Sequence, residues 1–276
     1  MTAPVVILDC YTVEPSGLGV PPYLSAYVRQ AYAALRRVRP DAEVKYVTID
    51  DVRWCLAGGR PLAEPPLSDR LTYSATVNRD KAVELLRDAD MVVVVAGDKV
   101  PSVHLHAVNG SQDDIARAMA CVRGRRFLLG PMATWALSEA ASWAGLFDAV
   151  HTHTVTSGGL SLGSTTPAPY GQLEADRSSF TGLVEQMPWD PVAELELYRG
   201  CTRKAFCRFC NEPGKAPTVA HRTVEDVLAE AGQLYDAGVR HFRLGQQTCF
   251  FSYQGRSEEA IRALLVGIRE RCPELE

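Results

Sequence analysis

The sequence predicts an α/β protein in which a mostly parallel, doubly wound sheet is followed by a second, shorter strand–helix unit. Three observations support this fold class. Short apolar runs alternate with helical patterns through the first half of the chain, a Gly/Ser/Thr/Pro-rich stretch follows, and strand and helix patterns then resume. The 276 residues, of which 46% are hydrophobic and 22% charged, are enough to form two cores.

The first half alternates strands with helices. Residues 5–8 form a short apolar run typical of a buried parallel strand, and residues 91–96, MVVVVA, give the clearest strand pattern. Residues 22–38 have helical spacing, with Pro22 near the first turn. The other predicted elements are strands at 44–49, 126–129 and 149–155, and helices at 81–87, 115–122 and 133–144. This alternation favours a doubly wound, Rossmann-like sheet with right-handed crossovers.

The second half begins with a linker. Residues 156–171, TSGGLSLGSTTPAPYG, are rich in small residues and proline. We therefore divide the chain into a first domain (1–156), a linker (157–190) and a second unit (191–276). The second unit reads as a strand at 193–198, a helix with an N-cap at Thr223, a strand at 239–245 and a helix at 258–271.

Composition excludes several classes of protein. A formal net charge of −4 argues against a nucleic-acid surface that covers the whole molecule, and no apolar run is long enough for a membrane span. The N-terminus, MTAPVVILDC, has no basic segment and reads as a strand instead of a signal peptide. We expect a cytoplasmic protein with no membrane association, whose eight cysteines are thiols or metal ligands.

Three cysteines stand close together in YRGCTRKAFCRFCNEPG, residues 198–214. Cys201, Cys207 and Cys210 follow a predicted strand and precede a helix, which predicts a metal-binding loop. Structural zinc takes four protein ligands, and the nearby candidates for a fourth, Cys249 and His221, read better as a loop thiol and a solvated histidine. A three-cysteine iron–sulfur site instead leaves one iron open for a substrate.

The loop resembles that of the radical S-adenosylmethionine (radical SAM) enzymes. There, three cysteines hold a [4Fe–4S] cluster at the end of the first strand of a partial (β/α) TIM barrel, and S-adenosylmethionine chelates the fourth iron. The resemblance implies these cofactors, and it implies an external electron donor such as ferredoxin or flavodoxin. It assigns the cluster to Cys201, Cys207 and Cys210, places Phe209 near the adenine, and makes Arg243, Gly245 and Gln246 position-matched candidates for contacts to S-adenosylmethionine.

The chain departs from the family pattern in two places. Five residues, instead of the usual three, separate Cys201 from Cys207. The segment RLGQQT, residues 243–248, lacks the usual acidic residue, and a glycine in a turn between a strand and a helix needs no ligand to explain it.

The whole chain is similar to a narrower group of radical SAM proteins that have an N-terminal cobalamin-binding-like domain. Residues 18–29, LGVPPYLSAYVR, resemble the start of that domain, so cobalamin is a possible cofactor. The usual Asp-x-His-x-x-Gly motif is absent, because Asp9 is followed by Tyr11 and no glycine stands at the matching step. Binding without a protein ligand and a domain that binds nothing both stay open, and the histidines considered as alternative ligands are His104, His106, His151 and His153.

Only 75 residues follow Cys201, which leaves space for about two strand–helix units. A complete barrel needs about 200 residues, so we expect this chain to be a portion of a longer protein. The expected function is a radical SAM enzyme whose substrate (small molecule, RNA or protein) and catalytic residues the sequence does not identify. Methyl transfer would follow if cobalamin binds, and hydrogen abstraction or methylthiolation if it does not. The alternative is a non-catalytic, zinc-stabilised binding module.

Overall fold

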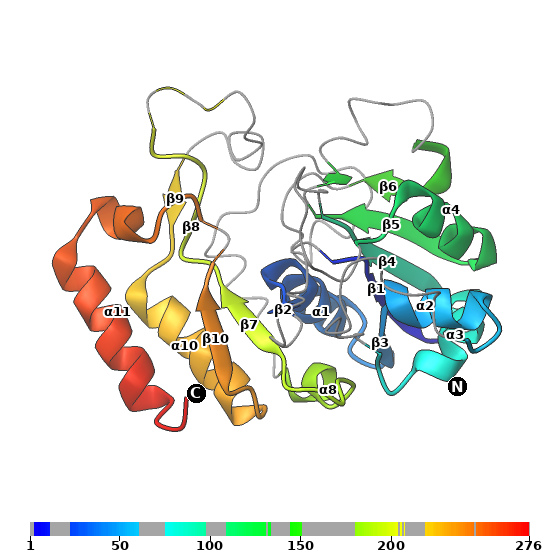
Figure 1. The fold of residues 1–276 in the computed structure, drawn as a ribbon, viewed down its shortest axis with the longest axis horizontal. Coiled ribbons are helices and arrows are strands. Elements are labelled where there is room, and N and C mark those ends of the chain that lie inside the picture. The colour runs from blue at the N-terminus through cyan, green and yellow to red at the C-terminus, as the bar shows by residue number, and fades with distance from the viewer. Residues whose placement is uncertain are drawn as a thin grey trace.

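The computed structural model describes residues 3–11, 23–60, 75–97, 109–130, 132–133, 144–150, 180–203, 205, 207, 219–245 and 247–275. Two parallel sheets lie side by side in this part of the chain (Figure 1). Among the described residues, no helix combines the length and the apolar character that a bilayer span requires.

The first sheet has five parallel strands in the order β3-β1-β4-β5-β6. The direction in which strands are added reverses at β1, which makes the carboxyl end of β1 the topological switch point of a doubly wound fold. This confirms the predicted α/β class and parallel first sheet. The strands are β1 (Val5–Asp9), β3 (Val44–Thr48), β4 (Met91–Val95), β5 (Arg125–Leu129) and β6 (Ala149–Val150).

Helices cover both faces of this sheet. Val5 and Ile7 of β1 pack toward helix α1, whereas Val6 and Leu8 belong to a second core with α2, α3 and α4. Successive strand residues point to opposite faces, so burial on both faces explains the unbroken apolar runs. The helices are α1 (Ala26–Val38), α2 (Ile49–Leu56), α3 (Ala82–Asp88) and α4 (Gln112–Cys121), with short 3-10 turns η1 (Arg79–Lys81) and η2 (Ala144–Leu146).

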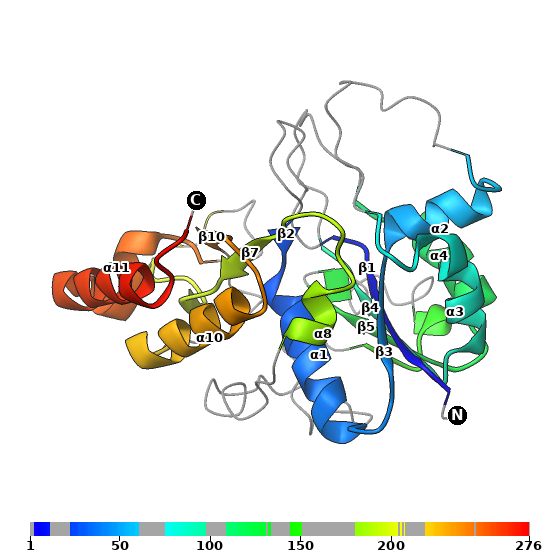
Figure 2. The ribbon, with the colours of Figure 1, turned by 90° about the horizontal axis from the view of Figure 1, so that it is seen from below.

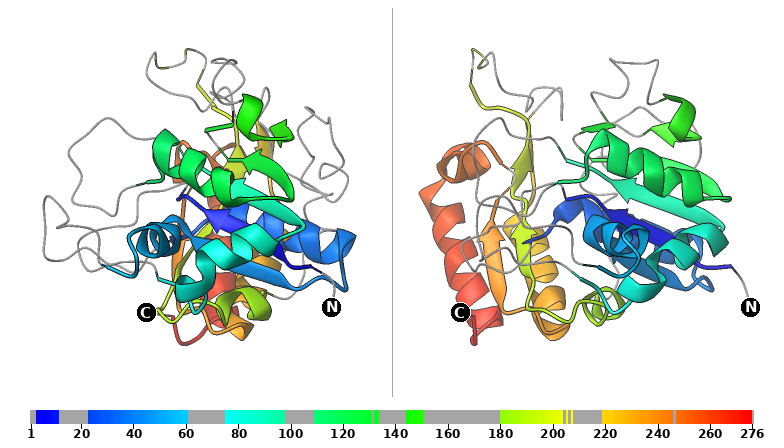
Figure 3. Two further views of the ribbon diagram at one scale, coloured as in Figure 1. Left: turned by 90° about the vertical axis from the view of Figure 1, so that its right-hand side faces the viewer. Right: turned by 45° about the vertical axis from the view of Figure 1, so that its right-hand side comes forward.

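The second sheet has three parallel strands in the order β10-β7-β2. A short antiparallel pair, β8 and β9, follows the end of β7. Helix α11 lies on the side of this sheet that is farthest from the five-stranded sheet (Figures 1 and 3). The elements are β2 (Tyr23–Leu24), β7 (Val192–Leu195), β8 (Tyr198–Arg199), β9 (Ala220–His221), β10 (His241–Leu244), α8 (Thr181–Val184), α10 (Val224–Asp236), η3 (Phe250–Gly255) and α11 (Glu258–Arg271).

Helix α1 joins the two sheets through one continuous core. It lies between them (Figure 2) and contacts β1, β3 and β4 on one side and β7 on the other. Within the predicted linker, residues 180–190 include α8, and Phe180 and Leu183 are buried in this shared core. The division of the chain into two domains stays a prediction.

Several predicted elements differ from the structure in their boundaries, and two of them differ in kind. The helix predicted from residue 22 begins at Ala26, because residues 23–24 pair with β7 as strand β2 and Ser25 caps the helix. The strand predicted at 193–198 is split, since Tyr198 leaves the parallel sheet to pair with His221. Most of the helix predicted at 133–144 lies outside the described residues.

Candidate functional site

The cysteine loop begins directly after β8, which itself follows the carboxyl end of β7. Gly200 has a φ of 85°, a conformation that favours glycine, and turns the chain into Cys201. Cys201 and Cys207 are both half-buried, and neither forms a disulfide. The guanidinium of Arg203 donates a hydrogen bond to Cys207 Sγ at 3.1 Å. Cys210 and Phe209 lie outside the described residues.

The segment that follows β10 lies beside the start of this loop. The Tyr198 hydroxyl donates to the carbonyl of Cys249 at 2.8 Å and accepts from its backbone N–H at 2.9 Å. Thr202 Oγ1 donates to Ser252 Oγ at 3.4 Å. Parallel strands that end on one edge bring their following loops together, so this juxtaposition follows from the β7–β10 pairing.

Cys249 is exposed at this edge. A hydrogen bond from the Ser252 hydroxyl, followed by backbone N–H groups of the same turn and the charge of Arg256, lowers the pKa of its thiol. Exposure and the lowered pKa both favour the thiolate form of Cys249 relative to a buried thiol. Its exclusion from the metal site stays a prediction.

His221 is held by neighbours on three sides. Its ring centroid lies 4.9 Å from that of Tyr198 and 6.1 Å from that of Tyr253. Its Nδ1 accepts the backbone N–H of Gln254 at 3.1 Å, and burial lowers the pKa of the imidazole. The sequence favoured a solvated histidine here, whereas the structure has a half-buried one that braces the β8–β9 pair against η3.

Two of the candidate contacts to S-adenosylmethionine lie at the end of β10. The Gly245 N–H donates to the carbonyl of Leu195 at 3.2 Å, and a Cβ at Gly245 would come within 2.7 Å of Glu194 Oε1. A neighbouring carboxylate therefore gives a structural reason for glycine at this position. Arg243 lies 3.5 Å from Glu194 Oε1, and its guanidinium covers the ring of Tyr23 at 4.9 Å. Gln246 lies outside the described residues.

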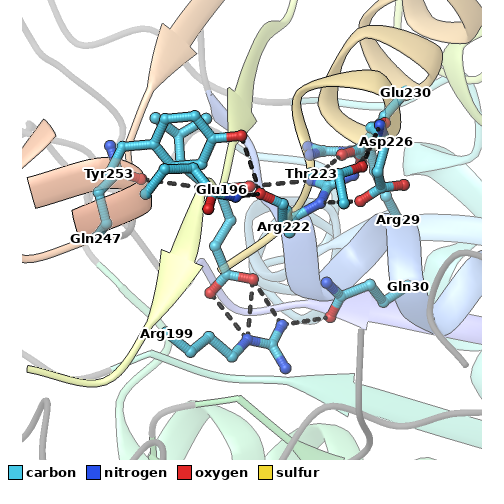
Figure 4. Close-up of polar contacts among 12 residues, drawn as sticks. Arg29, Gln30, Glu196, Arg199, Arg222, Thr223, Asp226, Glu230, Gln247 and Tyr253 are labelled. Atoms are coloured by element: carbon cyan, nitrogen blue, oxygen red, sulfur yellow. Dashed lines mark hydrogen bonds and ion pairs between the residues drawn. The ribbon is translucent and has the colours of Figure 1, made fainter. Parts of the chain in front are cut away.

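Two glutamates on β7 and the turn after it were missed by the sequence reading. Glu194 and Glu196 are both buried on the face of the strand opposite to Ala193 and Leu195. Glu196 accepts three hydrogen bonds of 2.7–2.9 Å from Arg199, which also reaches Gln30 Oε1 at 3.2 Å (Figure 4). The alternation in AELELY, which predicts the strand, also places both acids on one face.

The donor set of the cysteine loop fits an iron–sulfur cluster chemically. Thiolates are the ligands that such clusters take, and Cys201 and Cys207 lie on one loop at the carboxyl edge of a parallel sheet. Among the described residues, which do not include Cys210, no group of three potential ligands is gathered around one point.

Tyr11, at the switch point of the five-stranded sheet, is not placed to hold cobalamin. Tyr11 is 3% exposed, and its hydroxyl donates to Asp50 Oδ2 at 2.7 Å. Its backbone, with a φ of 65°, is held by a hydrogen bond from Tyr11 N–H to Asp9 Oδ1 at 2.8 Å. The Tyr11 side chain is thus part of a buried hydrogen-bond network. The four candidate histidines lie outside the described residues.

Comparisons with known proteins identify relatives but no function. No protein-family model matches the chain. The chain is similar to an uncharacterized protein of Archaeoglobus fulgidus, with 33% identity over 279 residues, which cover 98% of this chain and 46% of the relative. It is also similar to an uncharacterized protein of Methanocaldococcus jannaschii, with 29% identity over 300 residues, which cover 98% of this chain and 50% of the relative. The chain thus spans about half the length of these curated relatives.

Proposed function

We propose that this chain is a portion of a radical SAM enzyme, and that its second sheet forms the first part of a partial (β/α) barrel. One observation carries the proposal. Strand β7 is the first parallel strand of a β7–α10–β10–α11 series. The CxxxxxCxxC segment begins directly after β8, a few residues beyond the carboxyl end of β7, and the segment after β10 lies beside its start. Active sites of β/α barrels lie at this edge of the sheet.

Each part of the site has a proposed role. Cys201, Cys207 and Cys210 would hold a [4Fe–4S] cluster, and Arg243 and Gly245 would border S-adenosylmethionine. A cluster held there would supply the single electron needed for reductive cleavage of the sulfur–C5′ bond of S-adenosylmethionine, with methionine and a 5′-deoxyadenosyl radical as the expected products. The protein would bind and orient the sulfonium and exclude water from the radical. The substrate and the activity of the whole protein belong to the proposal as well.

The sequence resemblance of residues 18–29 makes cobalamin a possible cofactor of residues 1–156, but no step is assigned to cobalamin. The hydroxyl of Tyr11 already donates a hydrogen bond to Asp50, so this side chain is not placed to bind cobalt. Binding without a protein ligand can be tested directly, by titrating the protein with a cobalamin and following its visible spectrum and the melting temperature. If neither the spectrum nor the melting temperature changes, residues 1–156 have a structural role only.

Anaerobic reconstitution with iron and sulfide tests the proposed function. We expect a brown protein with about four irons per chain, a composition that three cysteines and one open iron require. Replacement of Cys201, Cys207 or Cys210 by alanine should abolish the colour. Cys121→Ala is the matched control, because Cys121 is a half-buried thiol on α4, outside the loop.

The alternative outcome is equally clear. A colourless protein that retains one zinc per chain would contradict the enzyme and support a zinc-stabilised binding module. Loss of colour in Cys121→Ala as well would show that colour loss is not specific to the loop cysteines and would remove this support for them as ligands.

A further inference from the structure

The strand that leads to the cysteine loop has an edge closed by side chains instead of by a strand. Strand β2 pairs with β7 only at Val192 and Ala193. Beyond that point the carbonyls of Glu194 and Glu196 point to the same edge, since Leu195 O between them points to β10 and accepts from Gly245. Buried carbonyls need donors, so this edge requires a substitute for the missing strand.

Two arginines supply those donors. Arg29 Nη2 donates to the carbonyl of Glu194, and Arg222 Nη1 donates to the carbonyl of Glu196 at 3.0 Å. Arg29 also donates through Nη1 to the carbonyl of Leu24 at 2.6 Å, at the end of β2. Side chains of two arginines thus continue the hydrogen bonding of β2 along the rest of β7.

Glu230 on α10 fixes the two arginines relative to each other (Figure 4). Its Oε1 accepts from Arg29 Nε at 2.9 Å, and its Oε2 accepts from Arg222 Nη1 at 2.6 Å. Arg29 is fully buried and Glu230 is nearly so. Burial raises the pKa of Glu230, but the charges and hydrogen bonds of Arg29 and Arg222 outweigh it and hold that pKa at about 2.

The network crosses between the two halves of the fold. Arg29 belongs to α1, which covers the five-stranded sheet, while the Glu194 carbonyl lies 165 residues further along the chain. A guanidinium has a rigid fork of donors, so an arginine bonded to three groups fixes their relative orientation as well as their charge. The carboxyl end of β7 is therefore oriented by a helix of the first sheet.

We propose that Arg29 is a positioning residue for the cysteine loop: through Glu230 and Arg222 it sets the direction in which the chain leaves β7 toward Cys201. The proposal rests on the proposed function for what the loop binds. It further implies that the second unit, without α1, would not hold its cysteines in a binding geometry.

Arg29→Lys in the full chain tests this role, because lysine keeps the charge but cannot bond all three partners. Amide hydrogen exchange of the metal-free protein, followed by mass spectrometry, is the first measurement. We expect exchange at residues 194–199 to accelerate about tenfold or more, with no change in β4. Arg36→Lys is the control, since Arg36 lies on the same helix and donates to the Ala42 carbonyl away from β7.

Reconstituted protein gives the second measurement. For Arg29→Lys we expect fewer irons per chain than in the wild type and an altered electron paramagnetic resonance spectrum of the reduced cluster, at temperatures where the protein stays folded. Glu230→Gln, which is nearly isosteric, should show the same two changes. It replaces Arg29→Lys as the test variant if Arg29→Lys does not fold. A spectrum and iron content equal to those of the wild type would overturn the positioning role, even if exchange were faster.

The two proposals fail in different ways. If the wild type binds no cluster, the proposed function is wrong, and the exchange data on the metal-free protein still decide whether Arg29 holds the end of β7. If the wild type binds four irons and Arg29→Lys matches it in exchange, the inference about Arg29 is wrong and the proposed function stands.

Discussion

Asp9 at the carboxyl end of β1 should make the protein less stable as pH rises through the mildly acidic range. The side chain is 1% exposed. Its Oδ1 accepts the Tyr11 N–H and its Oδ2 accepts the Tyr46 hydroxyl, both at 2.8 Å. Burial raises the pKa of this carboxyl from 3.8 to about 6, although the two hydrogen bonds act in the opposite direction.

The sign of the effect follows from the direction of the shift. The folded protein holds the Asp9 proton more tightly than the unfolded chain does. Asp9 therefore contributes stability that is fully present below pH 3.8 and is lost as pH rises through about 6. A shift of about two pH units corresponds to about 3 kcal/mol.

Asp9→Asn isolates this contribution. The asparagine can accept the Tyr11 N–H through its oxygen and donate through its nitrogen to the Tyr46 oxygen, so both contacts are retained. Urea unfolding at a series of pH values should show the wild type losing about 3 kcal/mol more than the variant between about pH 4 and about pH 7. Asp51, whose pKa burial also raises to about 6, titrates in both proteins and cancels in the difference.

Asp41→Asn is the control for this experiment, because Asp41 is exposed on the loop before β3. It should follow the wild type at every pH. An equal loss of stability in the wild type and Asp9→Asn would refute the reasoning, since the Asp9 carboxyl would then have the same proton affinity in the folded and unfolded states.

Three further predictions concern the second unit. Gly245→Ala should lower the free energy of unfolding by roughly 1–3 kcal/mol in urea melts, because its Cβ would lie 2.7 Å from Glu194 Oε1. An unchanged urea midpoint would show that the Glu194 side chain can move aside. Cys249→Ser should retain both the cluster colour and the binding of S-adenosylmethionine, and a lost metal would instead indicate a closed four-thiolate site. The pKa of Glu230 is lowered from 4.5 to about 2, so its contribution of roughly 3 kcal/mol to the free energy of unfolding is present above about pH 4.5 and is lost as pH falls toward 2. Glu230→Gln should not show this loss of stability when the protein is titrated with acid. A variant that loses as much stability as the wild type at low pH would contradict the prediction.

The sequence determined the elements whose causes are local. The predicted bounds of α11 coincide with the observed helix, and the predicted cap of α10 is present, with Thr223 Oγ1 accepting the Asp226 N–H at 3.1 Å. Caps and helical periodicity depend on residues close together in the chain, so they can be recognised in the sequence. The same holds for α2, where Thr48 and Asp51 form a capping box that the sequence contained and the prediction passed over.

The cysteine spacing is likewise a property of the sequence, and the loop that carries it begins near the edge where β7 and β10 end together. What the sequence could not determine is which distant segments complete that edge. Strand β2 has two residues and joins β7 from a region that reads as the start of a helix. A two-residue strand carries too little periodicity to be recognised before its partner is known.

Only the tertiary structure decided which groups surround Arg29. Arginine on a helix is usually exposed, and its helical neighbours gave no reason to expect otherwise. Its partners, Glu230 and the Glu194 carbonyl, are 201 and 165 residues away in sequence. A buried charge is tolerated only when partners surround it, and those partners are brought together by the packing of α1 between the two sheets. The spacing of the cysteines that we propose as cluster ligands is therefore local, whereas the direction in which the chain leaves β7 toward them depends on contacts that exist only in the folded chain.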